Sequence, residues 1–178
     1  MALPNGAAIP SKRRPQLVTR RATLDDVVPF MASIRPADRR ESLAGSGIPT
    51  GVALKRVIPE GTTNLIALLD GTPLVLWGVR PHLQYPKVGI VWLVATVQAE
   101  RRLVALHQEM RWQLDEALTA YPTLWNVVWE GNALHVHWLR RIGAEFIAHH
   151  PKLGPLDEPF LEFTITRDNL TPFSRSAF

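Results

Sequence analysis

The chain has 178 residues, of which 46% are hydrophobic, and carries a formal net charge of +4 at pH 7. This length supports one domain with its own core and is short for two. The absence of cysteine excludes a disulfide framework, thiol catalysis and a cysteine-ligated metal site. No apolar run is long enough for a membrane span, since the longest candidate, Gly89 to Val97, has the length of a strand.

The first sixteen residues combine prolines, a glycine and a basic cluster without hydrophobic periodicity. We expect residues 1–16 to form a flexible basic arm. The cluster Lys12, Arg13 and Arg14 follows small apolar residues, which is the reverse of the order in a secretory signal, so no signal peptide is expected. These residues are candidates for binding partner proteins and for weak, salt-dependent contact with nucleic acid.

The next segment predicts a strand followed by short helices. Leu17 to Ala22 has the composition of a first strand. Thr23, with Asp26 three residues later, forms a capping-box pattern that predicts a helix through Ile34. Two further helical pieces are expected at residues 35–46 and 52–57.

The hydrophobic period then changes from that of a helix to that of a strand. Residues 65–69 and 73–79 predict a β-hairpin, because Asp70-Gly71 tolerates the positive dihedral angles of a primed turn. Val88 to Val97 is a nearly continuous apolar run, typical of a central strand that is covered on both sides.

The second half begins with the clearest helix of the chain. One apolar stripe defines its buried side, and the stripe consists of Leu103, Leu106, Met110, Leu114 and Leu118. Residues 124–129 then predict a buried strand, and Asn132 is placed as the N-cap of a short helix that Gly143 ends. Two last strands, at residues 145–148 and 160–166, are expected to pair across a loop from Pro151 to Pro159.

This order predicts an α/β (α+β) fold with a mixed central sheet of six to seven strands and helices on both faces. The expected organisation is an arm at residues 1–16, one domain at 17–166 and a tail at 167–178.

Two segments carry a resemblance to known families. The order of elements, with ATLDD opening the first helix and NALHVHWLRRIGA closing the last, resembles the GCN5-related N-acetyltransferase (GNAT) superfamily across residues 17–166. The segments YPTLWNVVWEGN, HWLRRIGAEF and FTIT are similar to small internal virion or morphogenesis proteins of short-tailed, T-odd-like bacteriophages. This second resemblance is strongest from Ala95 to Thr166.

The superfamily resemblance implies a site for acetyl-CoA. Its members offer backbone groups of the central strand to pantetheine, wrap the pyrophosphate with a glycine-rich loop and can contact the cofactor at the start of the last helix. The corresponding residues are Leu93, Val94, Ala95, Arg101, Arg102 and Asn132. Asn132 has a purely structural alternative role as a helix N-cap.

Two chemical parts of an active enzyme are missing from the pattern. The loop at residues 97–102, VQAERR, has no glycine, and Glu100 adds negative charge where phosphates would lie. Leu139 stands four residues before Gly143, where the superfamily commonly carries a tyrosine that protonates the leaving thiolate. Because leucine cannot donate a proton, we expect neither catalysis nor a bound cofactor.

The remaining titratable residues give no second site. Glu130 is the candidate general base if the protein is an enzyme, although Glu100 and Asp70 are alternatives and all three can be ordinary surface carboxylates. His135 and His137 are two residues apart on a helix and point to different sides, so no metal site is expected. His135 is expected to be partly buried and hydrogen-bonded to backbone.

Aromatic residues suggest a binding surface. Phe173 and Phe178 lie in the tail outside any periodic element, where they are candidates for docking onto a neighbouring protein. Most of the six tryptophans follow strand or helix-face patterns and are expected to fill the core. Any exposed tryptophan is a candidate interface anchor.

The sequence therefore favours a non-catalytic GNAT-fold phage protein that is virion-associated or acts in particle assembly. Its expected partners are phage structural proteins of the core, portal or tail region, with several copies in one assembly, and its expected location is the virion or the host cytoplasm. The alternative is an acetyl-CoA-dependent N-acetyltransferase that acts on a phage or host amine. A third hypothesis is an accessory factor that binds polyanions.

Overall fold

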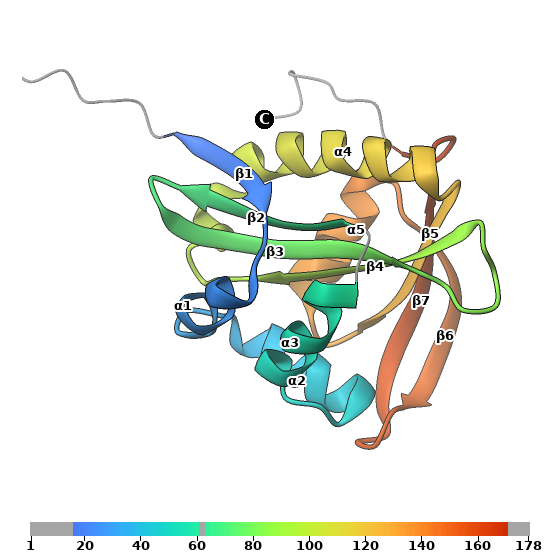
Figure 1. Cartoon of the computed structure of the whole chain (residues 1–178). Helices are drawn as coiled ribbons and strands as arrows, with labels where there is room; N and C mark the ends of the chain where they lie inside the picture. Colours follow the sequence, from blue (N-terminus) through green and yellow to red (C-terminus); the bar gives the residue numbers. More distant parts are fainter. Residues whose placement is uncertain (1–15, 61–62, 171–178) are drawn as a thin grey trace, which may run out of the picture.

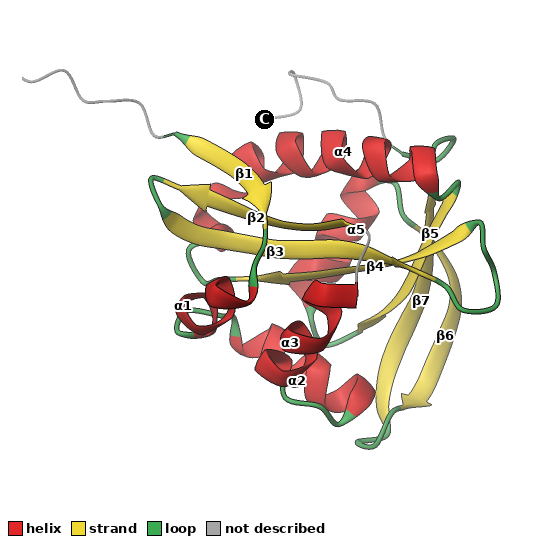
Figure 2. Ribbon diagram, in the orientation of Figure 1, coloured by secondary structure: helices red, strands yellow, loops and turns green. Residues whose placement is uncertain are grey.

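The computed structural model describes residues 16–60 and 63–170, which form a single sheet with helices on both sides (Figures 1 and 2). The strands are β1 (Leu17–Arg21), β2 (Thr63–Leu69), β3 (Thr72–Pro81), β4 (Val88–Ala95), β5 (Thr123–Trp129), β6 (Glu145–Leu153) and β7 (Glu158–Thr166). The helices are α1 (Val27–Met31), α2 (Pro36–Ser46), α3 (Thr50–Glu60), α4 (Leu103–Ala120) and α5 (Ala133–Ile142). This confirms the predicted element order and fold class.

The strands follow the order β1-β2-β3-β4-β5-β7-β6. Neighbouring strands are antiparallel except β4 and β5, which run parallel. That pairing covers only Val88–Ile90 opposite Thr123–Trp125, at one end of the two strands. Among the described strands, the remainder of β4 has no partner on this side, so the sheet is open there.

Two hydrophobic clusters cover the two faces of the sheet, because successive strand residues point to opposite sides. Ile66 and Leu76 pack with Phe30 of α1 and with α3. Trp77 packs on the other face with α4 and α5, for example with Leu114. Figure 1 shows α4 along one side of the sheet and α1 to α3 on the other.

Local sequence signals placed most elements correctly. Asp70 and Gly71 have φ angles of 48° and 81°, which confirms the primed hairpin turn. The capping box at Thr23 and Asp26 is present, but the helix that follows ends at Met31 and not at Ile34. Ile34 instead forms an isolated bridge with Thr96, so strand pairing replaces the last helical turn.

The predicted loop from Pro151 to Pro159 was wrong. β6 continues through Pro151 to Leu153, and the turn to β7 spans only residues 154–157. β6 lies at the edge of the sheet, where a proline is tolerated because its missing N–H leaves no ladder bond unmade. In the described part of the chain, no helix is long and apolar enough to cross a membrane.

Candidate functional site

The open end of the sheet, where β4 and β5 separate, contains a cavity of about 330 Å³. Apolar side chains from both faces line much of it, and they include Leu54, Trp77, Met110, Leu139 and Phe160. Polar side chains from α2 and α5 also line it, so the cavity has a polar side next to its apolar walls.

Arg35, immediately before α2, is the centre of a polar network and is buried. Its Nη2 donates to Oδ1 of Asn132 at 2.9 Å and its Nε donates to Oε1 of Glu100 at 3.0 Å. Its Nη1 lies 3.4 Å from Oδ1 of Asp38, one helical turn along α2. One guanidinium thus joins α2, the start of α5 and the turn that precedes α4.

Asp38 and Arg35 also occupy both backbone groups of Ala95, the last residue of β4. The Ala95 N–H donates to Oδ2 of Asp38 at 2.8 Å, and the Ala95 carbonyl accepts from the Arg35 N–H at 3.0 Å. Burial raises the pKa of Asp38 above its ordinary value, and the nearby Arg35 guanidinium and the Ala95 N–H oppose that shift. The open edge of β4 is therefore closed here by α2.

Asn132 precedes α5, at the predicted N-cap position, but its side chain does not cap the helix. Its Nδ2 donates to Oδ1 of Asp38 at 2.9 Å and to Oε2 of Glu41 at 2.7 Å, while its Oδ1 accepts from Arg35. The backbone of Asn132, with φ −84° and ψ 61°, is not in the extended conformation that directs a side chain at the first helical amides. The side chain connects α5 to α2 instead.

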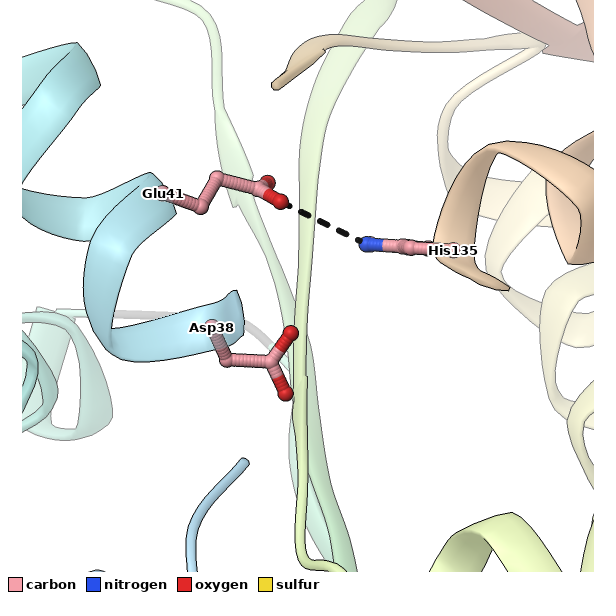
Figure 3. Close-up of side chains that lie close together, drawn as sticks. All are labelled: Asp38, Glu41 and His135. Atoms are coloured by element: carbon pink, nitrogen blue, oxygen red, sulfur yellow. Dashed lines mark ion pairs between the residues drawn. The ribbon is translucent and has the colours of Figure 1, made fainter. Parts of the chain in front are cut away.

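His135, one turn into α5, lies beside this network and is 9% exposed. Its Nδ1 is buried, has no hydrogen-bond partner among the described residues and lies 3.9 Å from Oε2 of Glu41. The expected backbone hydrogen bond is therefore not made by this nitrogen. Polar atoms of Asp38, Glu41 and His135 all lie within 4.8 Å of one another (Figure 3).

Sequence reasoning missed this group of three side chains. It compared His135 with the nearby His137, which is exposed, and not with carboxylates almost a hundred residues earlier. The available signal was the spacing of Asp38 and Glu41, which are three apart and therefore share one face of a helix.

The residues expected to hold acetyl-CoA are separated in the structure. Leu93 and Val94 line the cavity, whereas Ala95 lines a smaller hollow next to it. Arg101 and Arg102 are exposed and line a different hollow, together with Asp70. The glycine-free loop forms a turn of 3-10 helix at Ala99–Arg102.

The candidate catalytic residue Glu130 is half exposed, pairs with His149 of β6 at 3.2 Å and is not among the residues that line the cavity. Leu139 is buried and packs in the core of the α4 and α5 face. The predicted partner-binding residues Lys12, Arg13, Arg14, Phe173 and Phe178 lie outside the described residues.

Solved structures similar to this one have the GNAT fold. A GNAT-family acetyltransferase from Bacillus anthracis has a TM-score of 0.66 and 10% identity, covering 85% of this chain and 95% of that one. A GCN5-related N-acetyltransferase from Kribbella flavida has a TM-score of 0.62 and 20% identity, covering 84% of this chain and 97% of that one. These likenesses confirm the fold that the sequence pattern indicated.

Sequence comparison gives the family. Residues 66–151 match the family described as bacteriophage T7, probable scaffold protein Gp13. The probable scaffold protein gp13 of Escherichia phage T7 is 39% identical over 110 residues, which are 61% of this chain and 74% of that protein. The phage resemblance is thereby confirmed, and the chain belongs to the phage T7 Gp13 probable scaffold protein family, carried on a GNAT fold.

Proposed function

We propose that this protein is a non-catalytic GNAT-fold protein that acts in phage particle assembly by binding phage structural proteins. The probable scaffold role named for its T7 relative supports an assembly function. The expected location is the virion or the host cytoplasm during phage assembly.

The observation that carries the non-catalytic part is the occupation of Ala95. The resemblance to GNAT enzymes implies that backbone groups of this strand meet pantetheine, yet both groups of Ala95 are bonded to Arg35 and Asp38. A cofactor that used these groups would have to break both bonds and leave the buried Asp38 carboxylate and the Arg35 N–H without them, which is energetically expensive.

Two further features support the same conclusion. Glu100 lies in the loop where a pyrophosphate would bind and accepts a hydrogen bond from Arg35. The Arg35 guanidinium is therefore already paired with a carboxylate. Leu139 is buried at the position of the proton-donating tyrosine and offers only packing. The binding and proton-transfer parts of acetyl transfer therefore both lack support.

The surface offers apolar side chains suited to a partner protein. Trp112 on α4 is 61% exposed, and Leu83 and Tyr85 in the loop between β3 and β4 are 92% and 60% exposed. Large exposed aromatic residues are typical anchors of protein interfaces. We propose Trp112 as one such anchor, with the basic arm and the two tail phenylalanines as further contacts.

Cross-linking mass spectrometry on assembling particles from infected cells tests the assembly role. We expect cross-links to phage structural proteins in the wild type and fewer of them for Trp112→Ser. Val28→Ser on α1 is the matched control, because Val28 is also exposed but lies on the opposite side of the sheet. Absence of the protein from precursors and finished particles, together with absence of cross-links, would contradict the proposal.

Calorimetry with acetyl-CoA tests the rival enzymatic function. We expect no binding of acetyl-CoA to the purified full-length chain. Micromolar binding that is lost on charge reversal at Arg101 and Arg102 would instead favour an N-acetyltransferase. Titration with DNA at low and at physiological salt tests the third hypothesis, that the protein binds polyanions. Binding to phosphates must weaken steeply as salt rises.

A further inference from the structure

Asp38, Glu41 and His135 form a compact set of one nitrogen and two carboxylate ligands. Asp38 and Glu41 are three residues apart on α2, and Figure 3 shows both carboxylates extending from that helix toward the His135 ring on α5. The two elements are far apart in the chain, so the fold and not local sequence creates this arrangement. All three side chains also line the cavity at the open end of the sheet.

The Nδ1 atom of His135 is the second, independent sign of a ligand. It is buried, lacks a hydrogen-bond partner within residues 16–60 and 63–170, and faces Glu41, at 3.9 Å from Oε2. A buried nitrogen without a partner costs about 1–3 kcal/mol. Two ligand atoms that each lie roughly 2.1 Å from one metal ion are at most about 4.2 Å apart, so the 3.9 Å between Nδ1 of His135 and Oε2 of Glu41 is too long for a hydrogen bond but compatible with a shared cation.

The charge balance favours a cation at the same place. The buried guanidinium of Arg35 pairs with Asp38 and with Glu100, while the Glu41 carboxylate lies beside Asp38 and His135. Two neighbouring carboxylates, Asp38 and Glu41, thus share this place. Burial makes uncompensated carboxylate charge unfavourable. A divalent cation between Asp38 and Glu41 would remove the excess.

Asn132 currently occupies part of that position. Its Nδ2 lies between the two carboxylates, 2.9 Å from Oδ1 of Asp38 and 2.7 Å from Oε2 of Glu41. An amide N–H carries only a partial positive charge, so it substitutes incompletely for a cation. A metal ion must displace this amide, which limits the affinity to a moderate value.

We propose that Asp38, Glu41 and His135 bind one divalent first-row transition-metal cation such as Zn²⁺, with the remaining coordination positions facing the cavity. The imidazole nitrogen disfavours Mg²⁺ and Ca²⁺, which prefer oxygen ligands. Glu41 is less buried than Asp38 and has the longer side chain, so it makes the small rotation that closes the site. The site does not depend on the proposed assembly function.

Calorimetry with ZnCl₂ on the full-length, tag-free protein tests the site. We expect one ion per chain at micromolar affinity and a higher melting temperature with zinc than without it. His135→Gln and Glu41→Gln should each weaken binding by at least about tenfold. Co²⁺ provides a second readout, because its visible absorption reports coordination, and His135→Gln should lose that signal.

His149→Gln is the matched control. His149 also pairs with a carboxylate, Glu130, but on the surface, and the described part of the chain brings no third ligand to this pair, so zinc binding should not change. Circular dichroism of each variant establishes that it is folded, and Asp38 is left intact because it also holds Ala95. Absence of zinc binding, or equal binding by wild type and His135→Gln, would overturn the proposal.

Discussion

Two arginine–aspartate pairs of this protein have opposite electrostatic character. Arg20 and Asp26 meet at 2.6 Å near the end of β1, where the arginine side chain is 45% exposed. Arg35 and Asp38 meet at 3.4 Å at the open end of the sheet, where both side chains are buried. The hydrogen bond from Arg20 lowers the pKa of Asp26 to about 2, whereas burial raises the pKa of Asp38.

The difference shows that desolvation, more than the presence of an arginine, determines the direction in which the pKa of the aspartate shifts. At the end of β1, the hydrogen bond from the half-exposed Arg20 outweighs the desolvation of the buried Asp26 carboxylate. In the interior, desolvation of Asp38 outweighs the attraction of Arg35. Proton uptake as the pH falls therefore destabilises the fold at Asp26 and favours it at Asp38.

Removal of Asp38 is the strongest test of this contrast. Asp38→Ala removes a carboxylate partner of the buried Arg35 and leaves the Ala95 N–H without its acceptor. We therefore expect a loss of about 3–5 kcal/mol in the free energy of unfolding. Urea denaturation at pH 7 measures the effect. Asp25→Ala, at an exposed position, is the control and should change stability by less than about 0.5 kcal/mol. Similar small losses in both variants would show that the buried pair is not coupled to the fold.

Substitutions of Asn132 distinguish its two possible roles, which are bridging α5 to α2 and capping α5. Asn132→Ala removes the bonds to Arg35, Asp38 and Glu41, and we expect a loss of about 2 kcal/mol. Asn132→Ser retains a good capping residue but cannot span the network. If bridging is the role, urea denaturation will give similar losses for both variants. Near-wild-type stability of Asn132→Ser would restore the capping interpretation.

The pair of Arg20 and Asp26 gives a smaller, pH-dependent effect. Asp26→Asn removes the charge that Arg20 stabilises, and we expect a loss of about 1 kcal/mol at pH 7, after allowing for screening at the exposed arginine. Asp26 has a lower pKa folded than unfolded, so its contribution is present above pH 4 and disappears as the pH falls toward 2. Urea midpoints of wild type and variant should therefore converge in acid. A constant difference across this range would contradict the assignment.

Exposed arginines should show the smallest effect. Arg101 and Arg102 are exposed before α4, so the double charge reversal Arg101→Glu and Arg102→Glu should change stability by less than about 0.5 kcal/mol. Thermal unfolding at low and high salt measures it. A loss comparable to that of Asp38→Ala would mean that solvent exposure does not govern the energetic role of charges in this protein.

The sequence by itself determined the order of elements and most of their positions, and it shows a glycine-free loop at residues 97–102 and a leucine at position 139. These signals are local: the Asp70-Gly71 turn, the apolar stripe of α4 and the glycine after α5 act through neighbouring residues. Predicted element boundaries were wrong where a residue distant in sequence competed for the backbone. Ile34, for example, bridges Thr96 and does not continue the helix. The resemblance to a phage family was likewise readable, because it depends on residue identity alone.

Only the tertiary structure decided the polar network. Helical spacing places Asp38 and Glu41 on one face of α2, but it cannot say that this face meets His135 of α5. Nor can a local rule show that the Asn132 side chain bonds to buried charges in preference to the first amides of its own helix. Those outcomes depend on the open end of β4, where side chains from distant segments replace a missing strand partner and burial sets the energy of every charge.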